Sequence, residues 1–218
     1  MGAAMYRYAR DSLEYGRAVA FFDAAYAFAL TLLVVNVEPP PASAWGSLPA
    51  LLDAGLGGHL LGFAMSFLVV AVFWRLNHWL LSAMAGLTTL LIVVSFVALA
   101  CVVLIPFTTQ GLSDPATSGT PLAVALYAID VSAAGIANSA LYWCARAQGM
   151  LRVRLSPRIE ILRLFDAVCA VGVFLASIGV AYIWGADAAR WSWLTLIPLA
   201  VLSSALRRRE ARRTAPGA

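Results

Sequence analysis

The sequence predicts an all-α, polytopic membrane protein with six transmembrane helices and both termini in the cytoplasm. Of its 218 residues, 62% are hydrophobic and only 12% are charged, whereas a soluble globular protein is about 45–50% apolar and about 25% charged. The apolar residues form six runs of the length that a bilayer-spanning helix needs, about 20 residues each. The arginines gather in alternate connections between these runs.

The six runs predict a single six-helix membrane domain over residues 1–218. The expected spans are 18–37, 54–76, 84–107, 121–145, 160–184 and 189–206, followed by a short basic cytoplasmic tail, 207–218. Helices are preferred to barrel strands because strands would be short and alternating, and nothing in this sequence alternates for long.

Turn-forming or charged stretches separate the spans in order. "EPPPASAWGS" follows the first span and "RLNHW" closes the second. "TTQGLSDPATSGTP" follows the third, "RAQGMLRVRLSPR" follows the fourth, and "GADAAR" parts the last two. Proline, glycine and serine are the residues that punctuate helices, so each break is supported by its local sequence.

The distribution of arginine sets the expected orientation. All 15 basic residues are arginine. The N-terminal segment, the end of the second span, the fourth connection and the tail carry 14 of them: Arg7, Arg10, Arg17, Arg75, Arg146, Arg152, Arg154, Arg158, Arg163, Arg207, Arg208, Arg209, Arg212 and Arg213. The opposite connections carry only Arg190, against Glu38, Asp114 and Asp187. Basic loops stay in the cytoplasm, so an even number of spans places both termini there.

A cleaved secretory signal is the alternative for the N-terminal region. Basic residues, an apolar run and "ASA" at 42–44 resemble such a signal with its small-residue cleavage site. However, the apolar run contains Asp23 and is long enough to span the membrane. Its removal would leave five helices, and the basic segments would no longer all lie on one side of the membrane. A retained first span is therefore the preferred interpretation.

Several ionisable residues fall inside the apolar runs. Asp23, Asp130 and Asp166 lie within spans, and Arg75, Asn77 and His78 lie near the inner end of the second span. An ionisable group at bilayer depth costs a few kcal/mol or more, so it marks a functional site or a pin between two helices. Asp53 and His59 lie near the outer end of the second span and are expected at the interface.

The first span has two different faces at 100° per residue. Phe21, Ala24, Phe28, Thr31 and Val35 share one stripe, and Arg17 lies near its cytoplasmic end. Asp23 lies more than 90° away from Phe28. We therefore expect Asp23 to point into a seam between helices, while Phe28 and Thr31 face something else. From periodicity alone, such a stripe is more often a packing surface than the lining of a pore.

Several segments resemble a known channel family. "RAVAFFD", residues 17–23, is similar to the R-x-x-x-F-S-D signature of the first helix of the lysosomal potassium channel family (transmembrane protein 175) and its bacterial relatives. "FAMSFLVVAVFWRLNHWLL", 63–81, resembles that family's second helix, which ends in an aromatic, tryptophan and histidine cluster. "LIPFTTQGL", 104–112, and "LTLIPLAVLSSALRRR", 194–209, resemble the end of its third helix and its last helix.

The resemblance implies a potassium-preferring cation channel in the plasma (inner) membrane of a bacterium, with no cofactor. Bacterial members assemble as homotetramers in which the first helix of each subunit lines a central pore. Phe28 would stand at the apolar constriction, Thr31 a turn later and Val35 at the next inward-facing position. Arg17, Phe21 and Asp23 carry the motif, and Asp23 would pair with Trp74, Asn77 or His78 to hold the pore helix.

The sequence departs from the family pattern at three positions. Phe22 replaces the motif serine, Asn77 and His78 stand where a histidine pair is common, and Phe28 is larger than the usual isoleucine or leucine. Four phenylalanines around one axis could close a pore by dewetting or could bind a cation on their ring faces. If Arg17 faced the pore axis, four guanidinium groups would repel potassium. Either an acid therefore neutralises it, with Glu14 or one on another helix as candidates, or the pore does not pass cations.

The sequence also bears on three other functional classes: a transporter, an enzyme and a nucleic-acid-binding protein. A proton-coupled transporter using Asp23, His78, Asp130 and Asp166 is the main alternative. An enzyme is not expected, because the H-E-x-x-H, G-x-S-x-G, P-loop and dinucleotide motifs are missing from the sequence. Cys101, Cys144 and Cys169 have no metal-ligand spacing, so no metal is expected. The arginine-rich tail directly follows a span, which favours anionic lipid over nucleic acid as its partner.

Overall fold

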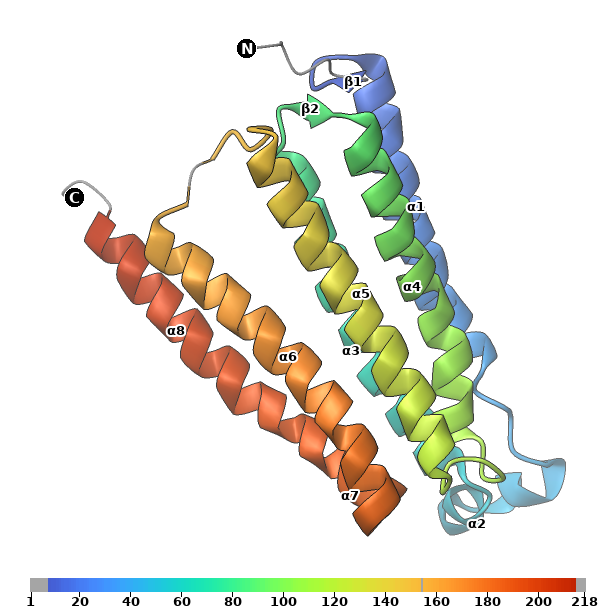
Figure 1. Ribbon diagram of the computed structural model, residues 1–218. Coiled ribbons are helices and arrows are strands. Elements are labelled where there is room, and N and C mark those ends of the chain that lie inside the picture. The colour runs from blue at the N-terminus through green and yellow to red at the C-terminus, as the bar shows by residue number, and fades with distance from the viewer. Residues whose placement is uncertain (1–7, 154, 215–218) are drawn as a thin grey trace.

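The computed structural model describes residues 8–153 and 155–214, and its helices form one elongated bundle (Figure 1). Arg7 and Arg154, which the orientation argument used, and residues 215–218 of the predicted tail lie outside this range. Within it, six helical segments are long and apolar enough to cross a membrane, as the sequence predicted. The long helices are α1 (Leu13–Val35), α3 (Leu56–Ala83), α4 (Thr89–Ser113), α5 (Pro121–Ala147) and α6 (Pro157–Trp184).

The sixth segment is built from two helices in series. α7 (Ala186–Ser192) leads through a 3-10 turn, Trp193–Thr195, into α8 (Leu196–Thr214), and Ala186–Arg207 together have the length of one span. α8 lies on the outer side of α6 (Figure 1), and α6 and α7 connect this pair to the rest of the bundle through their contacts with α5. The turn and the short α2 (Leu48–Asp53) lie at the end of the bundle opposite the two chain termini.

Hydroxyl caps fix where four of the long helices begin. The side chains of Ser12, Thr88, Thr120 and Ser156 each accept a hydrogen bond from the backbone N–H three residues later. A cap of this kind satisfies one of the free N–H groups of the first turn and contributes about 1 kcal/mol. In a bundle whose helices are apolar along their whole length, these caps mark the ends more sharply than hydrophobicity does.

The boundary between the second and third spans differs from the expected one. α3 continues through "RLNHW" to Ala83, and α4 begins only at Thr89. Between them Gly86–Leu87 (β2) pairs antiparallel with Tyr8–Ala9 (β1), and the Arg10 guanidinium donates to the carbonyls of Ser82 and Met84. The Thr88 cap marks the start of α4 locally, whereas the residues before it are held by a partner strand near the N-terminus.

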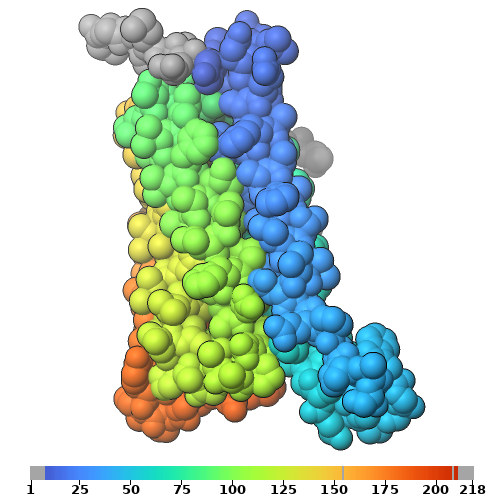
Figure 2. All heavy atoms as spheres, turned by 90° about the vertical axis from the view of Figure 1, so that its right-hand side faces the viewer, coloured from blue at the N-terminus to red at the C-terminus, as the bar shows by residue number. Residues whose placement is uncertain are grey.

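The core of the bundle lies along α4 and α5. These two helices make the most extensive contact in the structure, and α5 places a series of buried alanines against its neighbours. Small residues allow helix backbones to approach closely in a membrane, where packing rather than hydrophobicity drives association. α1 contacts α3 and α4 and forms a continuous strip along one flank of the molecule (Figure 2).

Candidate functional site

α1 buries one of its faces and leaves the other exposed. The buried face packs on α3 and α4 and consists of Tyr15, Phe22, Tyr26, Ala29 and Leu33. On the other side, the exposed fractions of Phe21, Phe28 and Val35 are 52%, 62% and 74%. Ala24 and Thr31 are also exposed, so the whole stripe that the sequence singled out lies on the surface of the protomer. The Thr31 hydroxyl donates to the Phe28 carbonyl at 2.8 Å, within its own helix.

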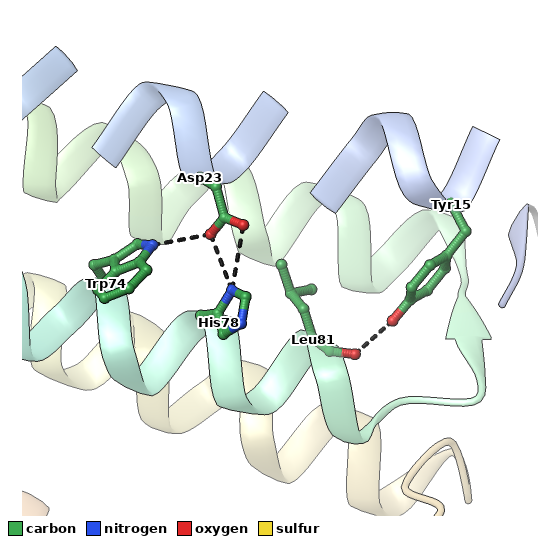
Figure 3. A network of polar contacts seen from close by, with 5 residues as sticks. All are labelled: Tyr15, Asp23, Trp74, His78 and Leu81. Atoms are coloured by element: carbon green, nitrogen blue, oxygen red, sulfur yellow. Dashed lines mark hydrogen bonds and ion pairs between the residues drawn. The ribbon is translucent and has the colours of Figure 1, made fainter. Parts of the chain in front are cut away.

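Asp23 is the centre of a polar network between α1 and α3 (Figure 3). The Trp74 indole N–H donates to Asp23 Oδ1 at 3.0 Å, and His78 Nδ1 lies 3.3 Å from Oδ1 and 3.2 Å from Oδ2. Trp74 and His78 are four residues apart, which places them on the same face of α3. Their ring centroids are 5.5 Å apart. One carboxylate thus engages two aromatic donors at once.

Two other residues of the expected network lie outside it. Asn77 is 1% exposed, and its amide nitrogen has no hydrogen-bond partner among the described residues. Because Asn77 is one residue from His78, its side chain leaves α3 about 100° away. Arg17 is exposed, and within the described part of the chain it forms no ion pair with Asp23 or Glu14. Of the three proposed partners of Asp23, the structure brings Trp74 and His78 to it.

Two further hydrogen bonds tether α1, and sequence reasoning missed both. Near its first turn, the Tyr15 hydroxyl donates to the Leu81 carbonyl at 2.5 Å (Figure 3). At its far end, the Asn36 side chain donates to the carbonyl of Pro106 in α4, also at 2.5 Å. A tyrosine within a span and an asparagine at a helix end each suggest a hydrogen bond, but neither residue identifies the group that it contacts. With Asp23, these bonds fasten α1 to α3 and α4 at three levels along its length.

The remaining intramembrane acids are partnered on other helix seams. Asp130 of α5 is 8% exposed and accepts a hydrogen bond from Thr108 Oγ1 of α4 at 3.0 Å. Asp166 of α6 forms an ion pair with Arg207 of α8. Asp23 and His78 pair between α1 and α3. The hydrogen bonds and ion pairs of the described residues connect none of these three pairs to another, so each has the arrangement of a separate interhelical pin.

The chain is similar to known potassium channels. Residues 17–106, which contain the α1 stripe and the Asp23 network, match the family model described as endosomal/lysosomal potassium channel TMEM175. A potassium channel of Streptomyces collinus is 29% identical over 149 residues, 67% of this chain and 70% of the relative. A potassium channel of a Chryseobacterium species is 26% identical over 126 residues, 58% of this chain and 62% of the relative.

A solved structure has the same fold. The crystal structure of a lysosomal potassium-selective channel TMEM175 homologue from Chamaesiphon minutus superposes with a TM-score of 0.67 and 24% sequence identity. The superposition covers 88% of this chain and 99% of that one. At this level of identity the match demonstrates a shared arrangement of helices, and it includes nearly the whole length of the crystallised protein.

Proposed function

We propose that this chain is a member of the endosomal/lysosomal potassium channel TMEM175 family, whose model it matches over residues 17–106, and that it is a potassium-preferring cation channel of the bacterial plasma membrane. Conduction is passive, with potassium and related monovalent cations as the permeant ions. The working unit is a homotetramer in which one copy of α1 from each subunit surrounds a central pore. Both termini face the cytoplasm in this arrangement, as the arginine distribution predicts.

The observation that carries the proposal is the asymmetric attachment of α1. Every tether described above joins the helix to α3 or α4, and Phe28, Thr31 and Val35 remain exposed. A helix that lines a pore must be held in this way, because its inward side chains have no contacts within their own subunit. Phe28 forms the apolar constriction, and Thr31 and Val35 line the pore on the side of Phe28 away from Arg17.

Arg17 lies on the same stripe as Phe28, since eleven residues make about three helical turns. Four guanidinium groups at the inner mouth would repel potassium unless acids neutralise them. We assign this role to Glu14, one turn before Arg17 in the same helix, or to a carboxylate of the adjacent subunit. The net charge at the inner mouth of the pore is then close to zero, and the constriction at Phe28 determines the ion selectivity.

Flux from proteoliposomes tests the proposal directly. The purified full chain is reconstituted with a potassium gradient, and ion movement is followed with sodium, rubidium and caesium in place of potassium. We expect flux that follows the electrochemical gradient, passes rubidium and caesium as well as potassium, and persists when a protonophore collapses the proton gradient. Flux that stops when the proton gradient is collapsed would instead support a coupled transporter. Proteoliposomes that release no potassium would exclude conduction.

Asp130 provides a second test that separates a channel from a transporter. In Asp130→Asn the side chain keeps an oxygen that can accept the Thr108 hydrogen bond but can no longer carry a proton. We expect the variant to assemble and to conduct within about twofold of the wild type, because the hydrogen bond can still form. Even its complete loss would cost only about 0.6 kcal/mol, the average contribution of an interhelical hydrogen bond in a membrane. Thr108→Val, which removes the donor, is the matched control for the loss of the hydrogen bond itself. Loss of flux in Asp130→Asn but not in Thr108→Val would identify Asp130 as a proton carrier.

A further inference from the structure

A small cavity lined by both apolar and polar residues lies away from α1, between residues of α3, α4, α5 and α7. Its volume is about 90 Å³, and its polar wall includes Ser66, Ser113, Tyr127, Arg190 and Trp193. Two of these groups are held together: Ser66 lies 3.2 Å from the Tyr127 hydroxyl and accepts a hydrogen bond from Thr109, which lies behind the wall, at 2.7 Å. This hydrogen-bonded chain joins α3, α4 and α5 and fixes one side of the cavity.

Three of the residues that line the cavity carry a buried donor that lacks an acceptor. Trp193 is 5% exposed and Ser113 is 8% exposed. The Trp193 indole N–H, the Ser113 hydroxyl and the Arg190 Nε–H are buried and have no hydrogen-bond partner among the described residues. Leaving a buried donor unpaired costs about 1–3 kcal/mol. Three such groups around one cavity therefore point to a bound species that accepts hydrogen bonds.

Contacts with neighbouring residues hold two of the donors, those of Trp193 and Arg190, in place. The Trp193 ring stacks on Tyr127 with 5.2 Å between centroids and contacts Phe174 at 5.3 Å. The Arg190 guanidinium donates through another nitrogen to the Ser118 carbonyl. Its Nη1 lies 3.5 Å from Asp187, whose side chain is 86% exposed. These contacts leave Nε without an acceptor, and preorganised donors of this kind bind an acceptor at a reduced cost in entropy.

The charge of the wall favours an anion over a neutral molecule. Arg190 brings a guanidinium, and none of the described residues that line the cavity is acidic. At about 15 Å³ for each water-sized group, the volume holds about six such groups, and a phosphate has five heavy atoms. Arginine and tryptophan are also typical of the membrane interface, where lipid headgroups lie.

From this geometry we infer that the cavity is a binding site for a phosphate group, held by Arg190, Trp193 and Ser113. The group is supplied either by an anionic lipid headgroup or by free phosphate. The inference does not depend on ion conduction, because the cavity lies within one subunit and shares no residue with the α1 stripe or the Asp23 network.

Binding is tested on the purified full chain in a neutral detergent. Thermal unfolding is measured with inorganic phosphate against chloride at equal ionic strength, and adducts of phosphatidic acid and phosphatidylcholine are counted by native mass spectrometry. We expect a higher Tm with phosphate, or retention of phosphatidic acid but not of phosphatidylcholine. The first result identifies a free anion as the ligand, and the second alone identifies a lipid headgroup.

Variants of the cavity then locate the site. Ser113→Ala and Trp193→Phe remove one donor each, and we expect the Kd for the bound species to rise about tenfold in each, because a hydrogen bond to a charged group contributes about 1.5 kcal/mol or more. A methyl group at Gly62 would overlap the Ser113 hydroxyl and enter the cavity, so Gly62→Ala should abolish binding. Gly172→Ala in α6 is the matched control, since its new methyl group meets nothing.

Two outcomes would overturn the inference. One is the absence of any effect of phosphate or phosphatidic acid on the wild-type protein, which would mean that the cavity holds only water. The other is binding that survives unchanged in Ser113→Ala, Trp193→Phe and Gly62→Ala, which would place the anion elsewhere. Each variant is accepted only if it elutes from size exclusion as the wild type does.

Discussion

Replacement of Phe28 by alanine should raise potassium flux on the order of tenfold. In the proposed pore, four Phe28 rings narrow the axis to an apolar ring that excludes water, and an ion must lose its hydration to pass it. Lowering that barrier by only about 1.4 kcal/mol increases the rate about tenfold. The measurement is potassium efflux from proteoliposomes at matched protein content, with single-channel conductance in planar bilayers as the independent readout.

Phe165→Ala is the matched control for this substitution. Phe165 is 55% exposed, close to the 62% of Phe28, but it lies on α6, which packs against α5, α7 and α8 and not against α1. The two variants therefore lose the same ring from an exposed position, and only one of them lines the proposed pore. Equal flux in Phe28→Ala, Phe165→Ala and the wild type would move the constriction to another part of the molecule.

Phe28→Leu distinguishes between the two ways in which the phenylalanine could act. Leucine keeps a bulky apolar group at the constriction but has no ring face on which a cation could bind. If the rings act by dewetting, conduction in Phe28→Leu stays near the wild-type level. If they bind the permeant cation, the preference among potassium, rubidium and caesium changes in this variant.

Replacement of Asp23 by alanine should weaken assembly before it affects ion selectivity. The substitution removes the acceptor for both the Trp74 indole and His78, and interhelical hydrogen bonds in membranes contribute about 0.6–1.7 kcal/mol each. The Asp23 and His78 side chains are 32% and 47% exposed, so the loss should be near 1 kcal/mol for the pair of contacts. We expect a lower Tm and a smaller fraction of oligomer on size exclusion in mild detergent.

Asp23→Asn is the control that separates charge from hydrogen bonding. Asparagine keeps an oxygen for the Trp74 N–H but has no charge for His78, so it should fall between alanine and the wild type in both measurements. An Asp23→Ala protein that remains a stable oligomer and shows an altered order of ion preference would contradict the role of Asp23 as a fastening. In that case the carboxylate would belong to the permeation path.

The candidate site was partly predictable because helix periodicity is a local property. The separation of Asp23 from Phe28 follows from 100° per residue. The pairing of Asp23 with Trp74 and His78 could be narrowed to three candidates by the resemblance. It could not be decided, because Asn77 and His78 are adjacent and only the rotation of α3 about its axis determines which one faces α1. The Tyr15 and Asn36 bonds end on backbone carbonyls, which every residue has and no sequence motif marks.

The sequence by itself determined the class of protein, the six membrane segments and their expected orientation. These follow from composition, from the length of apolar runs and from the placement of arginine. Each of these properties depends on many residues together, so a single contact hardly alters it. Tertiary structure alone decided how the residues after α3 pair with a strand near the N-terminus, and the partners of the buried acids. It also gathered Ser113, Arg190 and Trp193 around one cavity. Such features depend on contacts between residues distant in the chain, and in helices that are apolar on every side the sequence does not reveal which face meets which neighbour.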